Sequence, residues 1–176
     1  YWPHRVAQGG EMLVPGDGHE PVQFVDGRDL GEWIVHLAET RTPGVFNATG
    51  PDYRLGTDAF VHGLHAVTGG PIRFTHVPAA FLAGQGVAFG ADLPIWFPAD
   101  HPFAGFGQVD NRRAIAAGLR FRPLATTVGD LLAWHRARPD ERRRTLRAGM
   151  SRERETALLR AWHAAGKGAG EGDGHA

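Results

Sequence analysis

The stretch PVQFVDGRDLGEW, residues 21–33, decides how the rest of the chain is interpreted. Its apolar run Val22–Val25 has the length and composition of a β-strand, and Asp26 with the following glycine ends that run. From Asp29 onward the apolar residues recur at helical spacing. The passage therefore predicts a strand that leads almost directly into a helix.

The same alternation continues on both sides of this passage. Further strands are predicted at Glu11–Val14, Val45–Thr49 and Ile72–Val77. Further helices are predicted at 2–9, from Thr57 or Asp58 to Val67, at Asp110–Ala117, from Thr126 or Thr127 to Trp134, and from Ser151 onward. Residues 78–107, rich in proline, glycine and aromatic side chains, are expected to be irregular. Strands that alternate with helices predict an α/β fold.

Composition excludes several classes of protein. The chain has 176 residues, of which 42% are hydrophobic, and this is enough for a core of its own. Its 19 basic and 19 acidic residues balance, so no electrostatic footprint for nucleic acid or an anionic membrane is expected. The chain has no cysteine, and no apolar run approaches the roughly 18 residues that span a bilayer. The absence of an apolar leader makes the cytoplasm the expected location.

Three segments together resemble the extended short-chain dehydrogenase/reductase family, also called the NAD-dependent epimerase/dehydratase family. Residues Pro21–Trp33 resemble the family's strand-to-helix passage, and GVFNATGP at Gly44–Pro51 resembles a strand with an Asn-x-x-Gly turn. Residues Val109–Trp134 are similar to the family's C-terminal pattern of an Asp-led helix, Gly-Leu, an aromatic residue, proline and a helix ending at Trp. The alternative for this last segment is an unrelated capped helix–turn–helix.

The resemblance implies the C-terminal, substrate-binding part of a Rossmann-like NAD(P)-binding enzyme. Residues 1–135 would form the substrate-binding region, with Val45–Thr49 as one edge strand of the nucleotide-binding sheet and the helix around Trp33 covering it. Residues 136–165 would form a helical extension and residues 166–176 a flexible Gly-rich tail. The missing N-terminal nucleotide-binding half is the expected partner, because the chain starts without Met inside a predicted helix.

The family's catalytic and cofactor motifs are absent. The resemblance implies a Tyr-x-x-x-Lys pair, but neither Tyr1 nor Tyr53 is followed four residues later by lysine. Gly84-Gln85-Gly86 with Gly90 imitates a dinucleotide loop, but it lacks the strand before it and the helix after it that would bind pyrophosphate. No catalytic residue is therefore assigned. NAD or NADP is expected in the full-length parent and not bound tightly by this chain alone.

The substrate is expected to be a small carbonyl or alcohol compound. Nucleotide-sugar epimerases of the family carry an arginine where this chain has Val22, and a second phosphate arginine appears here as His101. Apolar side chains cannot compensate the desolvation of a diphosphate, so a nucleotide sugar is disfavoured. The candidate substrate-binding residues are Trp2, Phe24, Asp26, Trp96 and Phe97. The alternative is core packing for each aromatic residue, and capping of the following helix for Asp26.

Two other charged patterns have simpler explanations. His62 and His65 are three residues apart on a predicted helix and His76 follows on a strand, but no third ligand is identifiable by spacing and no metal is expected. The basic run from Arg142 to Arg154 is interrupted by glutamates, which favours a solvated helix surface with salt bridges over a nucleic-acid site.

Three functions remain open at this point. The first is the substrate-binding part of an NAD(P)-dependent oxidoreductase or epimerase. The second is a non-catalytic ligand-binding or interaction module derived from that family, and the third is an unrelated His-dependent hydrolase. The first also predicts that the apolar faces of Trp33, Val45 and Phe46 are exposed without the missing sheet, and this would favour a homo-oligomer.

Overall fold

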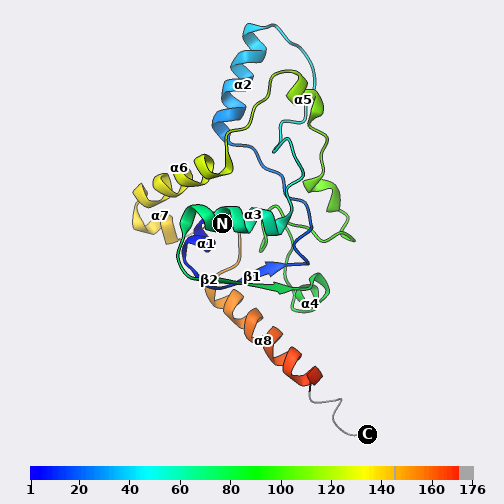
Figure 1. Ribbon diagram of the computed structural model, residues 1–176, viewed down its shortest axis with the longest axis vertical. Helices are drawn as coiled ribbons and strands as arrows, with labels where there is room; N and C mark the ends of the chain where they lie inside the picture. The colour runs from blue at the N-terminus through cyan, green and yellow to red at the C-terminus, as the bar shows by residue number, and fades with distance from the viewer. Residues whose placement is uncertain (145, 171–176) are drawn as a thin grey trace.

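The computed structural model describes residues 1–144 and 146–170 and has a mixed α/β fold (Figure 1). Its sheet consists of two parallel strands, β1 (Gly10–Pro15) and β2 (Ile72–Val77), with Gly10 opposite Ile72 and Pro15 opposite Val77. Both predicted strands at these positions are confirmed to within a residue at each end. Rossmann-like topology would need further parallel strands, and the described residues contain none in this sheet.

Helices surround the sheet and extend beyond it at both ends. They are α1 (Trp2–Ala7), α2 (Gly27–Glu39), α3 (Thr57–Thr68), α4 (Ala79–Gly84), the 3-10 helix η1 (Ala104–Gly107), α5 (Arg112–Ala116), α6 (Leu124–Ala137), α7 (Asp140–Arg144) and α8 (Arg152–Gly170). Figure 1 shows an elongated molecule, with α2 and α5 at one end, α8 at the other, and α1, α3 and the sheet between them.

Two hydrophobic clusters hold these elements together. The larger lies around the sheet and joins α1, α3, α4, α6 and α8, with Trp2, Met12, Leu64, Trp96 and Leu159 among its buried members. The smaller packs α2 against α5 through Trp33, Ala114 and Leu119. The indole N–H of Trp33 donates to the Ala117 carbonyl at 2.9 Å, so the polar edge of this ring is satisfied as well.

The outer edge of β1 is closed by side chains. The backbone N–H of Leu13 donates to Glu155 Oε1 at 3.0 Å, and the Glu11 carbonyl accepts hydrogen bonds from Arg152, at 3.1 Å, and from Arg5. Pro15 on the same edge has no N–H to satisfy. A further strand therefore cannot pair along this edge, which α8 occupies instead.

Two of the predicted strands are wrong. Within Val22–Val25 only Phe24 pairs, as an isolated antiparallel bridge to Gly50 with both N···O distances at 2.9 Å. Residues Val45–Thr49, expected to be an edge strand of a sheet, are not a strand, and Val45 is 84% exposed. An apolar run becomes a strand only where a neighbouring strand supplies a continuous ladder of hydrogen bonds. Within the described residues, Val22–Val25 has only the bridge to Gly50 and one bond from the Val22 N–H to the Leu55 carbonyl, and Val45–Thr49 pairs with no strand.

The predicted helices are confirmed, with changed ends. Asp26 caps α2 by accepting from the Arg28 N–H at 2.9 Å, and α6 begins directly after Pro123 instead of at Thr126 or Thr127. The helix at Asp110 shortens to α5, which Gly118 follows with a φ of +95°. α8 continues through Gly170 into the segment predicted as a tail, and 171–176 lie outside the described residues.

The helices bear on the expectation that no segment of the chain crosses a bilayer. Across residues 1–144 and 146–170, no helix combines the length and the apolar character that crossing a bilayer requires.

The predicted division at residue 135 falls inside α6, because that helix runs on to Ala137.

Candidate functional site

Two of the predicted substrate-binding residues, Phe24 and Asp26, line one small cleft of about 150 Å³. Its walls come from the segment before α2, from the loop at residues 51–53 and from the residues that lead into α6. The other lining residues are Asp29, Pro51, Tyr53, Phe121, Arg122, Pro123, Leu124 and Thr127. Segments about a hundred positions apart in the sequence therefore meet at this cleft.

Backbone contacts fix the position of the loop that forms one wall. Gly50 pairs with Phe24, and a Cβ atom at Gly50 would lie 2.4 Å from the Phe121 ring, so only glycine permits this close approach. The buried Asn111 amide donates to the Thr49 and Pro51 carbonyls at 2.8 and 2.9 Å. Asn111 thus satisfies two backbone acceptors of an irregular loop.

Asp26 lies at the base of the cleft and is fully engaged. It accepts hydrogen bonds from the Arg28 side chain at 2.7 Å and from the Thr127 hydroxyl at 2.7 Å. The Arg28 guanidinium beside Asp26 holds the pKa of that carboxyl well below its usual range. Asp26 is therefore an ionised residue that caps α2 and contacts α6, in agreement with the capping alternative, and it also borders the cleft.

Arg122 lines the cleft together with a second carboxylate, Asp29. Its Nε lies 2.6 Å from Asp29 Oδ1, and its Nη2 donates to Glu32 Oε1 at 2.8 Å. The hydrogen bond to Glu32 raises the pKa of Arg122 above its ordinary value. Because both acids accept from Arg122, its charge is neutralised inside the protein and is not offered to an anionic ligand.

Tyr53 separates this cleft from a second hollow. The second hollow, of about 270 Å³, has Gln23, Arg54, Gln108 and Asn111 among its lining residues. Tyr53 and Pro51 line both spaces, and Tyr53 is more than half exposed. Within the described residues its hydroxyl makes no hydrogen bond, so it can donate to or accept from a ligand on either side.

The other predicted site residues lie away from the cleft. Trp2 is buried, and its indole N–H donates to the Pro94 carbonyl at 2.6 Å. Trp96 is buried in the same core, where its indole nitrogen has no hydrogen-bond partner among the described residues. Phe97 stacks on His101 at 5.0 Å within a separate surface cluster with Phe103. Trp2 and Trp96 therefore have the positions expected of core residues.

Phe60 links two of these residues and was not identified from the sequence as a site residue. Its ring centroid lies 5.6 Å from that of Phe24 and 6.4 Å from that of Trp2. Tyr53, Phe121 and Arg122 are further cleft residues that sequence reasoning missed. The only sequence signal at these positions is the aromatic residue before Pro123 in the pattern at Val109–Trp134, and that pattern indicates fold and not a binding role.

The glycine-rich loop does not fit a dinucleotide. Gly84 is the last residue of helix α4, so no strand leads into this loop, and Gly86 has a φ of +68°. The next helical element is η1, which begins only at Ala104, so no helix N-terminus faces this loop. Gly84-Gln85-Gly86 with Gly90 therefore does not form the dinucleotide loop that it imitates in sequence.

The histidines considered as metal ligands have other partners. His62 Nδ1 donates to the Asp58 carbonyl at 2.9 Å, and His65 Nε2 donates to the Gly70 carbonyl at 2.9 Å. His76 Nε2 lies 2.8 Å from Asp58 Oδ1. No group of three or more His, Cys, Asp or Glu side chains within the described part of the chain is arranged to share a metal ion.

Comparison with known proteins gives no relative for this chain. No family model, no curated protein and no solved structure matches it. Its function is therefore inferred from the residues that carry the family resemblance and from the geometry of the cleft.

Proposed function

We propose that this chain is the substrate-binding, C-terminal part of an NAD(P)-dependent oxidoreductase or epimerase that acts on a small carbonyl or alcohol compound. The observation that carries the proposal is the cleft in which Phe24 and Asp26 meet Tyr53 and Phe121. Phe24 and Asp26 belong to the strand-to-helix passage that resembles the extended short-chain dehydrogenase/reductase family. Both line this cleft, whereas the other candidates Trp2 and Trp96 do not.

The chemistry of the cleft favours a small neutral substrate. The volume of about 150 Å³ suits a compound of a few heavy atoms, and aromatic residues and prolines make up half of the lining residues. Asp26 and Arg122 are already paired with protein groups, so a phosphate in this cleft would be left without compensation. The Tyr53 hydroxyl remains as the group that can hydrogen-bond a carbonyl or alcohol oxygen.

Exposed apolar side chains on α2 and in the segment after it favour a neighbouring chain or domain. Ile34 and Val35 on α2 are 55% and 56% exposed, and Val45 is 84% exposed. Trp33 differs from the prediction, because it is only 5% exposed and packs edge-to-face on Phe46 at 5.4 Å. The proposed partner for the exposed surface is the N-terminal nucleotide-binding half, which would also bring NAD or NADP.

The second candidate is a non-catalytic ligand-binding or interaction module. The same exposed side chains favour it, since a second copy of the chain could cover Ile34, Val35 or Val45 in a homo-oligomer. Both candidates predict a ligand in the cleft, but only the enzyme predicts hydride transfer. Oxidation of NADH or NADPH that depends on an added carbonyl compound, measured with the protein purified from its source, separates them.

Occupancy of the cleft can be tested directly. The protein is titrated with a panel of small ketones, aldehydes and secondary alcohols, and binding is followed by ligand-observed NMR. Tyr53→Ala should weaken binding by about tenfold, because it removes an aromatic wall and the free hydroxyl. Phe103→Ala is the matched control, since Phe103 is also an exposed aromatic residue but does not line the cleft. Equal weakening by both variants would refute the proposed site.

A further inference from the structure

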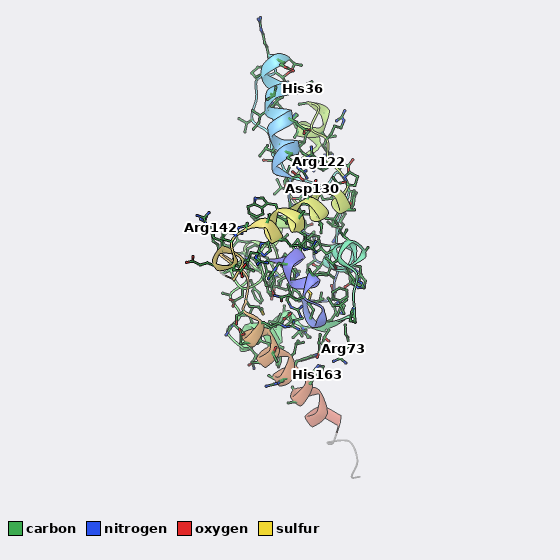
Figure 2. The ribbon with its side chains drawn as sticks, turned by 90° about the vertical axis from the view of Figure 1, so that its left-hand side faces the viewer. His36, Arg73, Arg122, Asp130, Arg142 and His163 are labelled. Carbon is green, nitrogen blue, oxygen red and sulfur yellow. The ribbon has the colours of Figure 1, made fainter. Side chains whose placement is uncertain are left out.

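A second site lies beyond the cleft, where α6 ends and α7 begins. A hollow of about 560 Å³ is lined there by Arg138, Glu141, Arg142 and Arg147. Figure 2 labels Arg142 at α7, well separated from Arg122 beside the cleft. Three arginines against one glutamate give this lining a formal charge of +2.

The positive charge of this hollow is not neutralised by the protein. Within residues 1–144 and 146–170, Arg138, Arg142 and Arg147 form no ion pair, whereas the neighbouring Arg143 pairs with Asp140. Arginines elsewhere in the chain, such as Arg5 and Arg122, are paired with carboxylates. Three guanidinium groups around one open space repel each other, and an anion between them would remove this repulsion.

Arg138 is held in place for such an anion. Its guanidinium carbon lies 4.8 Å from the centroid of the Trp134 ring, so a cation–π contact fixes a long side chain at the edge of the hollow. Trp134 is itself more than half exposed, although it is a large apolar side chain. Fixing the arginine in advance reduces the entropy that binding would otherwise cost.

We propose that this hollow binds a multiply charged phosphate compound. Guanidinium groups match phosphate oxygens in a bidentate geometry, and a dianion or trianion outweighs the repulsion from Glu141. A nucleic-acid surface is disfavoured because the 19 basic and 19 acidic residues of the chain balance. The inference does not depend on the proposed function, because none of the hollow's residues borders the cleft.

The test is a calorimetric titration of the intact protein with inorganic pyrophosphate at low ionic strength. Arg142→Gln and Arg147→Gln should each weaken binding by about tenfold, because each removes a charge-assisted hydrogen-bond donor. Arg136→Gln is the matched control: Arg136 is exposed, carries the same charge and lies outside the hollow. Glu141→Gln should strengthen binding several-fold, since it removes the only negative charge of the lining.

Three results of this titration would overturn the proposal. The first is that pyrophosphate shows no saturable binding, the second is that Arg136→Gln weakens its binding as much as Arg142→Gln does, and the third is that Glu141→Gln leaves its affinity unchanged. Binding of a single-stranded oligonucleotide that pyrophosphate does not compete with would also overturn it, in favour of a nucleic-acid surface. The source of the phosphate is tested by sedimenting the protein with anionic phospholipid vesicles. If the protein sediments and pyrophosphate reverses this, the ligand is a lipid headgroup; if the protein stays in solution, the ligand is a soluble compound.

Discussion

The Thr127 hydroxyl donates a hydrogen bond to Asp26 Oδ2 at 2.7 Å and so joins the N-terminus of α2 to the first turns of α6. The same carboxylate accepts from the Arg28 N–H at 2.9 Å and from the Arg28 guanidinium. One side chain therefore caps a helix, connects two elements and forms part of the base of the cleft.

Asp26→Ala should destabilise the protein by about 2 kcal/mol, because it removes the cap of α2 and leaves the Thr127 hydroxyl without its acceptor. Thr127→Val, which removes only one of these hydrogen bonds, should cost about 1 kcal/mol. Urea unfolding measures both values. If Asp26→Ala lowered the free energy of unfolding by no more than Thr127→Val does, Asp26 would not both cap α2 and connect it to α6.

Glu11 should make the protein sensitive to acid. Burial favours the neutral form, but hydrogen bonds from Thr75, His163 and Arg73 outweigh it and lower the pKa of Glu11 from 4.5 to about 2. Figure 2 shows Arg73 and His163 near each other, where β2 and α8 pass close to this residue. A carboxyl with a lowered pKa stabilises the fold fully above its unfolded pKa, and this contribution is lost as the pH falls from about 4.5 to about 2.

The corresponding measurement compares Glu11→Gln with the unchanged protein in thermal unfolding from pH 6 to pH 2. The variant should be less stable by about 1 kcal/mol at pH 6, and it should lose less stability on acidification. Parallel curves for the two proteins over this range would contradict the assigned role of Glu11.

The buried pair Arg5–Glu155 should be a strong determinant of stability. Arg5 Nε lies 2.5 Å from Glu155 Oε2, and the two side chains are 4% and 1% exposed. Glu155→Gln leaves Arg5 as a buried, uncompensated charge and should cost about 3 kcal/mol. Glu153→Gln, an exposed change on the same helix, should cost less than about 0.5 kcal/mol. Similar losses in denaturant unfolding would show that α8 is not held by this pair.

Gly107 should not tolerate a side chain. A Cβ atom there would lie 2.0 Å from the Pro21 carbonyl oxygen, whereas a Cβ atom at Gly105 in the same 3-10 helix would meet nothing within 4 Å. Gly107→Ala should therefore destabilise the protein by about 2 kcal/mol, because backbone must move, and Gly105→Ala should be nearly neutral. Thermal unfolding of the two alanine variants is the check, and equal midpoints would exclude the close approach of Gly107 to Pro21.

Local sequence signals predicted most of the helices and both strands of the sheet. α2 follows from apolar residues spaced around Trp33, and β2 follows from alternation over IRFTHV after the glycine pair that ends α3. The failures at Val22–Val25 and Val45–Thr49 have one cause. A strand depends on a neighbour, and the local sequence does not say whether that neighbour is present.

The cleft could be predicted only in part. Phe24 and Asp26 can be predicted because they lie in the passage that resembles the family, but Tyr53 lies beyond the loop that Asn111 holds, and Phe121 comes from a distant segment. Contacts between such distant segments depend on packing that no local pattern encodes. Trp96 shows the converse, because an aromatic residue in a Pro-rich stretch has the same local pattern whether it is buried or lines a cavity.

The most direct test of the proposed function is the intact mass of the protein isolated from its source, combined with peptide mapping. The chain described here has a mass of 19.1 kDa. A substrate-binding part of an NAD(P)-dependent enzyme predicts a protein of roughly twice that mass, as a second domain of similar size requires, with peptides that carry a glycine-rich loop and a Tyr-x-x-x-Lys pair. A native protein of 19.1 kDa without those peptides would contradict the proposal and leave the ligand-binding module.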